Sequence, residues 1–305
     1  MTTADFVTLD VFTDTRFAGN PLAVFADARG IGDETMQRIA REFNYSEITF
    51  VLPPEDPANT ARVRIFTPTM EIPFAGHPNV GTAFVLGRMG TLFGRPLGDT
   101  LRFEEKAGLV TVKLLRDQGI VTGAEIRAPR PLTIGDTVAA ELVARCASID
   151  AGSITAAAHA PVFVSVGLPF VVAELDGLDA LATAKPNVSA FHDAAERHRQ
   201  AETDFSLFLY TRMPADPWHI RARMFAPLDT VMEDPATGSA SAALGAYLAT
   251  LAPGSDAEIS MTIEQGVEMG RRSLIGLAVT KRAGTVTDVR ISGQSVEVMR
   301  GSITC

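Results

Sequence analysis

Hydrophobic and polar residues alternate with a period of two at the start of the chain, which predicts β-strands. Residues 7–12 and 21–25 are the clearest runs of this kind. Residues 33–43 instead carry apolar side chains three and four positions apart, the spacing of a helix with one buried face. We expect Asp33 to cap this helix and Asn44 to end it in a left-handed turn. Period two returns directly afterwards, so the chain opens with the order strand, strand, helix, strand.

Two later segments are small and apolar on every side, residues 76–87 and 239–249. A helix without a polar face is buried all round, so each segment predicts a helix enclosed by other structure. A turn motif also recurs, because residues 19–24 resemble residues 167–172 about half a chain later. Motifs that recur in the same order favour a duplicated unit of strands, surface helix, strands, buried helix and more strands.

The boundary between the two halves is expected at residues 127–132, where two prolines interrupt regular structure. Residues 286–299 predict two alternating strands, and this tail could return to complete the sheet of the first half. We therefore expect an N-terminal half of residues 1–128 completed by residues 291–305, and a C-terminal half of residues 129–290.

Composition narrows the class of protein. The 305 residues include 27 Lys or Arg and 36 Asp or Glu, a formal net charge of −9, which argues against nucleic-acid binding. No apolar run approaches the ~20 residues of a membrane span, and no signal-peptide pattern is visible at the start. Cys146 and Cys305 lie far apart, which suits a reducing cytoplasm and excludes a thiolate zinc site. The five histidines have no metal-ligand spacing, so we expect neither a metal nor another cofactor.

Chemistry is concentrated beside the two apolar segments. Asp234 opens the run Asp-Pro-Ala-Thr-Gly-Ser, and His77 holds the position in the first half that Ser239 holds in the second. Glycine-preceded helix starts offer unpaired N–H groups, which favour a small anionic ligand. The alternatives are a turn aspartate, a buried structural histidine and ordinary helix caps. Glu47 lies at a junction between helix and strand, where a turn can direct its side chain.

Four motifs together resemble the PhzF-type phenazine-biosynthesis family: segments 10–25, 45–47, 74–83 and 233–240. The resemblance spans nearly the whole chain and keeps the family's order. It implies an α+β, diaminopimelate-epimerase-like fold of two pseudo-symmetric halves. Each half would be a β-barrel-like mixed sheet around a central buried helix, with the site in the cleft between the halves.

The resemblance also implies roles for individual residues. Glu47, His77 and Asp234 match the family's catalytic positions. The implied substrate-binding positions are Asn20, Ser46, Gly76, Gly238 and Ser239. The two cysteines used by related amino-acid epimerases would fall at Ala75 and Thr237, and neither side chain exchanges a proton usefully. A two-thiol mechanism is therefore excluded.

The expected activity is a cofactor-independent proton shift within a small cyclic, amino or hydroxy carboxylate, with Glu47 as general acid and base. The family's prototype acts on trans-2,3-dihydro-3-hydroxyanthranilate. Two alternatives stay open at this point: an isomerase or epimerase of another amino-acid-like carboxylate, and a non-catalytic metabolite-binding protein that retains the cleft. A homodimer is expected from the family resemblance.

Overall fold

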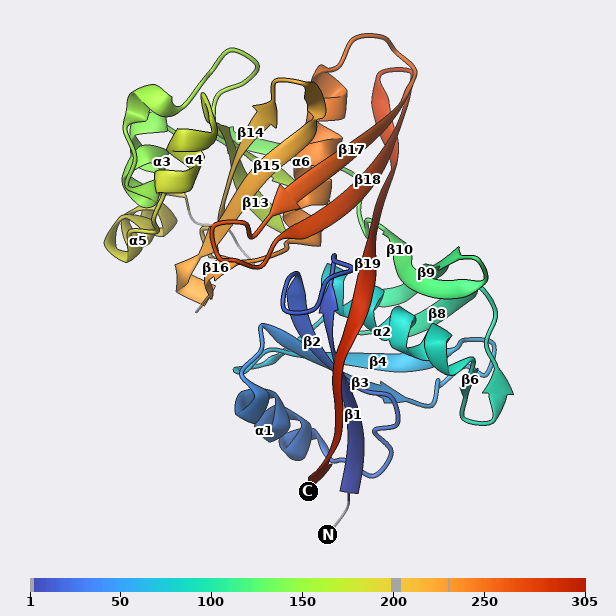
Figure 1. The fold of residues 1–305 in the computed structure, drawn as a ribbon. Coiled ribbons are helices and arrows are strands. Elements are labelled where there is room, and N and C mark those ends of the chain that lie inside the picture. The colour runs from blue at the N-terminus through green and yellow to red at the C-terminus, as the bar shows by residue number, and fades with distance from the viewer. Residues whose placement is uncertain (1–2, 199–203, 230) are drawn as a thin grey trace. The chain divides into compact units, whose positions relative to one another are not determined.

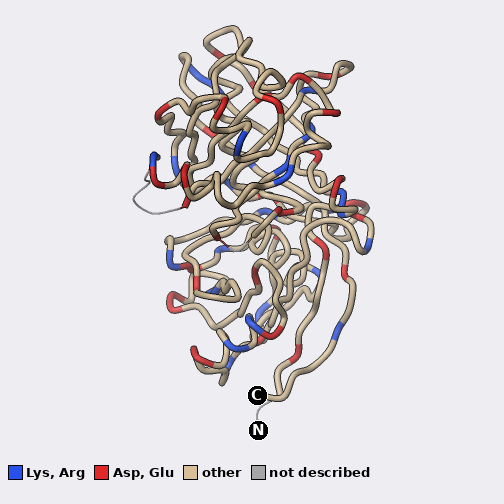
Figure 2. The backbone as a smooth tube through the Cα atoms, turned by 90° about the vertical axis from the view of Figure 1, so that its left-hand side faces the viewer, with Lys and Arg blue, Asp and Glu red and all other residues tan. Residues whose placement is uncertain are grey.

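The computed structural model describes residues 3–198, 204–229 and 231–305. Its contacts divide the chain into two compact units (Figure 1). Unit 1 consists of Met1–Arg127 and Ile291–Cys305, and unit 2 consists of Ala128–Arg290. Figure 2 shows acidic and basic residues interspersed along the chain in both units.

Unit 1 is a closed ring of eight strands. Its members are β1 (Thr3–Val11), β2 (Asn20–Phe25), β3 (Glu47–Leu52), β4 (Ala61–Phe66), β8 (Thr100–Glu105), β9 (Gly108–Asp117), β10 (Ile120–Arg127) and the C-terminal part of β19 (Thr285–Thr304). The pairs β2–β3 and β4–β8 are parallel. The pairs β1–β2, β3–β4, β8–β9, β9–β10 and β1–β19 are antiparallel, and a β10–β19 pairing closes the ring.

Helix α2 (Gly76–Met89) lies inside this ring, where it contacts the strands on several sides (Figure 1). Every residue from 76 to 86 is buried, as its uniformly apolar pattern predicts. The shorter strands β5 (Glu71–Ile72), β6 (Thr91–Leu92) and β7 (Arg95–Pro96) lie before and after α2 in the chain. The predicted enclosed helix is therefore confirmed in unit 1.

The surface helix α1 (Asp33–Phe43) ends at Asn44, whose φ of 54° is left-handed as predicted. Its N-terminal prediction was wrong, because Gly32 is the N-cap and no side chain caps the helix. The Asp33 carboxylate instead accepts from Arg64 Nη1 at 2.5 Å. An ion pair with a strand residue has taken the place of the local cap.

Unit 2 contains β11 (Thr133–Thr137), β12 (Val162–Ser165), β13 (Pro169–Glu174), β14 (Leu207–Met213), β15 (Asp216–Ala226), β16 (Val231–Asp234), β17 (Ala257–Gln265), β18 (Ser273–Arg282) and the start of β19. Its helices are α3 (Ala140–Ala147), α4 (Leu178–Thr183), α5 (Val188–Arg197) and α6 (Gly238–Leu251), with short 3-10 turns at Ala151–Ser153 and Pro227–Asp229. Helix α6 is buried almost throughout, so the second predicted enclosed helix is also confirmed.

The strand pairing of unit 1 recurs in unit 2. The parallel pairs β13–β14 and β15–β17 take the places of β2–β3 and β4–β8. The antiparallel pairs β12–β13, β14–β15 and β17–β18 correspond to β1–β2, β3–β4 and β8–β9. In both units the buried helix precedes the second strand of the second parallel pair. The molecule is thus a mixed α+β protein with a duplicated topology.

The C-terminal tail differs from its prediction. Residues 285–304 form the single strand β19 and not two strands. Gly293 makes this continuity possible, because a Cβ there would lie 2.2 Å from Phe12 Cδ1. A Cβ on Gly123 of β10 would likewise lie 2.0 Å from the carbonyl oxygen of Gly293. The two glycines therefore let β19 pass close to its neighbours in unit 1. Within the described part of the chain, no helix has the length and apolar character to cross a membrane.

Candidate functional site

Glu47 and His77 lie together in unit 1. Chain reversal at Asn44 brings Tyr45 and Ser46 directly before β3, and Glu47 is the first residue of that strand. His77 is the second residue of α2. The side chains of Glu47 and His77 are 19% and 6% exposed, and His77 Nε2 lies 3.6 Å from Glu47 Oε2. This distance exceeds a normal hydrogen bond, so the two groups are neighbours without a direct bond.

His77 is electrically neutral near neutral pH. Burial lowers the pKa of its imidazole to about 3, because the charged form would lose its hydration. Its Nε2 is buried and has no hydrogen-bond partner. A buried polar atom without a partner is costly, so it marks a position where another polar group could bind.

The other predicted site residues of unit 1 are Asn20, Ser46 and Gly76. Asn20 opens β2 and is almost fully buried, and Ser46 Oγ donates to Asn20 Oδ1 at 3.2 Å. Gly76 is the first residue of α2, so its N–H has no acceptor within the helix. The positive end of the helix dipole is therefore at Gly76 and His77.

The predicted residues of unit 2 form a second local cluster. Asp234 ends β16, and Gly238 and Ser239 open α6 after a three-residue loop. Asp234 is buried, and one of its carboxylate oxygens accepts from Thr237 Oγ1 at 2.5 Å. Ser239 is partly exposed. Ala75 and Thr237 are the N-caps of α2 and α6, the matching positions of the two units.

Gln265 holds this loop and was missed by the sequence analysis. Its fully buried side-chain carbonyl accepts from Thr237 N–H at 3.0 Å. Its amide donates to Asp234 O at 2.7 Å and to Thr237 Oγ1 at 3.0 Å. Gln265 lies 28 residues after Thr237, at the end of β17, so no local pattern connects the two.

Arg223 fixes the preceding strand by a bidentate ion pair. Its Nε and Nη2 each donate to the Glu233 carboxylate at 2.8 Å. The Arg223 Nη1 also donates to main-chain carbonyls at the end of α4, including Ala184 O at 2.8 Å. Glu233 precedes Asp234, so this buried pair sets the path of the backbone at the candidate aspartate.

The structure therefore brings the predicted residues together in two groups. Glu47, His77, Asn20, Ser46 and Gly76 belong to unit 1. The second group, in unit 2, consists of Asp234, Gly238 and Ser239. Convergence of the two groups at one cleft stays a prediction. Among the described residues, no cluster of three or more His, Cys, Asp or Glu side chains could hold a metal ion.

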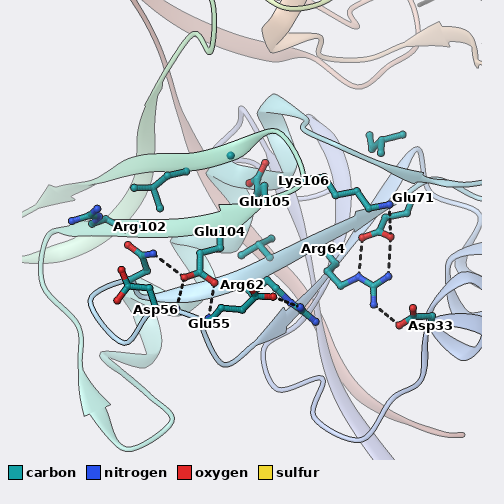
Figure 3. Close-up of a pocket in the computed structure, with 15 residues that line it drawn as sticks. Asp33, Glu55, Asp56, Arg62, Arg64, Glu71, Arg102, Glu104, Glu105 and Lys106 are labelled. Atoms are coloured by element: carbon teal, nitrogen blue, oxygen red, sulfur yellow. Dashed lines mark hydrogen bonds and ion pairs between the residues drawn. The ribbon is translucent and has the colours of Figure 1, made fainter.

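A hollow of about 760 Å³ opens on unit 1 beside β4, β5 and β8 (Figure 3). It is lined mainly by charged residues that pair with one another, such as Arg64 with Glu71 and Arg62 with Glu55. None of the predicted site residues lines it. The hollow is therefore separate from the group around Glu47.

Comparisons with known proteins place the chain in a family. Residues 9–301 match the family model for phenazine biosynthesis-like proteins, PhzC-PhzF. The trans-2,3-dihydro-3-hydroxyanthranilate isomerase of Pseudomonas fluorescens is 37% identical, with 98% of this chain and 99% of that protein covered. A crystal structure of a PhzF-family phenazine biosynthesis protein from Bacillus anthracis matches with a TM-score of 0.88 at 28% identity, over the full length of both chains.

A more distant structure shows the same fold. The hydroxyproline epimerase of Agrobacterium vitis matches with a TM-score of 0.63 at 13% identity, over 99% of this chain and 91% of that one. At this identity the match concerns the fold alone. The chain therefore shares its fold with the PhzF-family protein of Bacillus anthracis and with the hydroxyproline epimerase of Agrobacterium vitis.

Proposed function

The chain belongs to the phenazine biosynthesis-like protein family and is an isomerase. From this premise we propose that it shifts a proton within a small cyclic, amino or hydroxy carboxylate. The first substrate to test is trans-2,3-dihydro-3-hydroxyanthranilate, because the Pseudomonas fluorescens relative is named as the isomerase of that compound. We also propose that the fold is diaminopimelate-epimerase-like and that the protein is a homodimer.

The observation that carries the proposal is the pair Glu47 and His77 (Oε2 to Nε2, 3.6 Å). Glu47 is a half-buried carboxyl group beside a neutral imidazole whose Nε2 has no hydrogen-bond partner. A partly desolvated carboxyl group is suited to remove a proton from carbon. The neutral imidazole can bind a polar group of the substrate without adding charge.

In the proposed reaction Glu47 breaks one C–H bond and takes the proton. The electron pair of that bond moves through the conjugated system, and a different carbon receives the same proton from the Glu47 carboxyl. Substrate and product then have the same atoms and the same charge. One group serves as base and acid, so no second thiol or carboxyl group is needed.

Binding roles are proposed for the remaining residues. The N-terminus of α2, with Gly76 N–H, is suited to a carboxylate and to the negative charge that develops during proton transfer. Asn20 and Ser46 would orient polar substituents of the substrate. In unit 2, the family resemblance supports a catalytic orienting role for Asp234 and substrate binding by Gly238 and Ser239.

The test compares Glu47→Gln with the wild type in deuterium oxide. The amide keeps the shape of the side chain but accepts no proton, so exchange and turnover are expected to fall by about 10²–10⁴-fold. Substrates are trans-2,3-dihydro-3-hydroxyanthranilate and a panel of amino and hydroxy carboxylates. Glu42→Gln is the matched control, because Glu42 is exposed on α1 five residues earlier.

Equal turnover by Glu47→Gln and the wild type would remove Glu47 from its role. Turnover of another carboxylate but not of the anthranilate derivative would assign a different substrate to the same chemistry. Thermal stabilisation by a ligand without exchange or turnover would identify a binding protein instead of an enzyme.

A further inference from the structure

The side-chain amide of Gln265 has one chemically allowed orientation. Thr237 N–H is a donor, so the Gln265 atom 3.0 Å from this nitrogen must be the amide oxygen. Asp234 O is an acceptor, so the Gln265 atom 2.7 Å from it must be the amide nitrogen. Because both main-chain partners have fixed roles, the two ends of the amide cannot be exchanged without losing both hydrogen bonds.

This orientation also decides where the hydroxyl proton of Thr237 points. The Gln265 amide nitrogen lies 3.0 Å from Thr237 Oγ1 and donates to it, since an amide nitrogen accepts no hydrogen bond. The single proton of the hydroxyl is then left for Asp234 Oδ2, which lies 2.5 Å from Thr237 Oγ1. A chain of donors therefore runs from Gln265 through Thr237 to the Asp234 carboxylate.

The residues of this chain of hydrogen bonds are buried. Gln265 is fully buried, and Asp234 and Thr237 are each less than a tenth exposed. Gly266 follows Gln265 with a φ of 75°, and a Cβ there would lie 2.7 Å from Pro235 O. The end of β17 therefore packs directly against the main chain of the Asp234 loop. A hydrogen bond lost in so close a contact leaves a buried polar atom without a partner, which is costly.

Charged side chains on the neighbouring segments are paired with one another. Glu264 points to the other face of β17, because successive residues of a strand alternate. Its carboxylate binds Arg272 and lies 3.6 Å from Arg221 Nε and from His219 Nε2. The remaining ion pairs nearby are Arg221 with Glu268 (Nη2 to Oε1, 2.8 Å) and Arg223 with Glu233 (Nε to Oε1, 2.8 Å). Asp234 is the ionisable side chain in the chain of hydrogen bonds that begins at Gln265.

We infer that Gln265 is a positioning residue for Asp234: its amide holds Asp234 O and directs the Thr237 hydroxyl proton to the Asp234 carboxylate. The role needs an amide and not only its shape. In Gln265→Glu the ionised side chain would present acceptors to Asp234 O and to Thr237 Oγ1, and would compete with Asp234 for the hydroxyl proton. The effect on turnover rests on the proposed function, whereas the direction of the Thr237 proton does not.

The first experiment needs no substrate. A glutamate ionises near pH 4.3 in the unfolded chain, but among buried acceptors in the folded Gln265→Glu variant it keeps its proton to higher pH. The urea midpoint of Gln265→Glu should therefore fall further below that of the wild type at pH 8 than at pH 5. Gln37→Glu is the matched control, because Gln37 Nε2 donates to the main-chain oxygen of Thr67 at 2.9 Å on the surface helix α1, and its deficit should change less. A deficit of Gln265→Glu that is the same at both pH values would overturn the inference.

Hydrogen exchange in wild type labelled with ¹⁵N-glutamine provides a measurement that needs no variant. Both side-chain N–H groups of Gln265 are bonded, one to Asp234 O and one to Thr237 Oγ1. One glutamine side-chain amide with both protons protected in deuterium oxide supports the inference. Rapid exchange of every glutamine side chain overturns it.

The second experiment tests the positioning role by turnover of trans-2,3-dihydro-3-hydroxyanthranilate, below the thermal midpoint of each protein. At pH 8 kcat of Gln265→Glu is expected to be roughly tenfold below that of the wild type. At pH 5 the protonated side chain again has a donor, and kcat should return to within about threefold of the wild type. Gln265→Met has no donor and should stay roughly tenfold low at both pH values. A ratio of Gln265→Glu to wild type that does not change with pH would refute the positioning role.

Asp234→Asn separates a failure of the inference from a failure of the proposed function. Wild-type turnover by Asp234→Asn would refute the role proposed for Asp234. Slow turnover by Asp234→Asn together with an unchanged kcat of Gln265→Met would refute the role of Gln265 alone. A wild type inactive on this compound would refute the proposed substrate, and the urea midpoints would still decide the direction of the Thr237 proton.

Discussion

Replacement of His77 by glutamine should change how the stability of the protein depends on pH. Burial holds the pKa of the His77 imidazole at about 3, against 6.5 for an unperturbed histidine. Below pH 6.5 the unfolded chain takes up a proton that the folded protein does not bind. The wild type is therefore expected to lose stability as the pH falls from 6.5 toward 3.

The size of this loss follows from the two pKa values. A pH of 5 lies 1.5 units below the pKa of 6.5 that the histidine has in the unfolded chain. Each unit corresponds to about 1.4 kcal/mol, so His77 should account for about 2 kcal/mol of the stability lost between pH 7 and pH 5. Glutamine does not titrate, so His77→Gln should lose about 2 kcal/mol less stability than the wild type between pH 7 and pH 5, whatever its stability at pH 7.

The assay is urea unfolding of wild type and His77→Gln at pH 7 and pH 5. His192→Gln is the control, because His192 is exposed on α5. The quantity compared is each protein's change in the free energy of unfolding between the two pH values. A loss in His77→Gln equal to that of the wild type would show that His77 is not a buried neutral group.

Two further substitutions test the packing around the site. Thr237→Val removes the hydroxyl that donates to Asp234, and should lower the free energy of unfolding by about 1–3 kcal/mol. Thr250→Val is the control, because it removes a hydroxyl that donates within helix α6, and it should cost less. Equal losses in urea unfolding would contradict a structural role for the hydrogen bonds among Asp234, Thr237 and Gln265. Gly123→Ala forces a Cβ against the backbone of β19 and should cost about 3 kcal/mol. Gly98→Ala is the control, because a Cβ at Gly98 would meet no atom within 4 Å. Equal thermal midpoints for the two alanine variants would refute the close approach of β19 to Gly123.

The sequence was most informative where a pattern has one physical solution. A helix without a polar face is buried, and both α2 and α6 are. An asparagine tolerates the left-handed turn, and Asn44 adopts it. The four motifs also indicated the family, which the comparisons confirm.

Long-range contacts carry no such local signal. Gln265 and Arg223 bind the Asp234 loop from other strands, and their spacing in the sequence reveals neither contact. Asp33 has the right residue type for a cap, but Gly32 holds the N-cap position and the Asp33 carboxylate accepts from Arg64 of β4, a contact that no local pattern reveals.

The first and last strands of the chain are neighbours in unit 1, with Thr3 opposite Thr304 (Figure 1). During synthesis, the ring of unit 1 lacks one of its eight members until residues 291–304 have left the ribosome. Until then β1 and β10 each present an unpaired edge, the kind of backbone that associates with other chains. Loss of residues 291–305 through a premature stop codon should therefore favour aggregation, although Glu47 and His77 would both still be present.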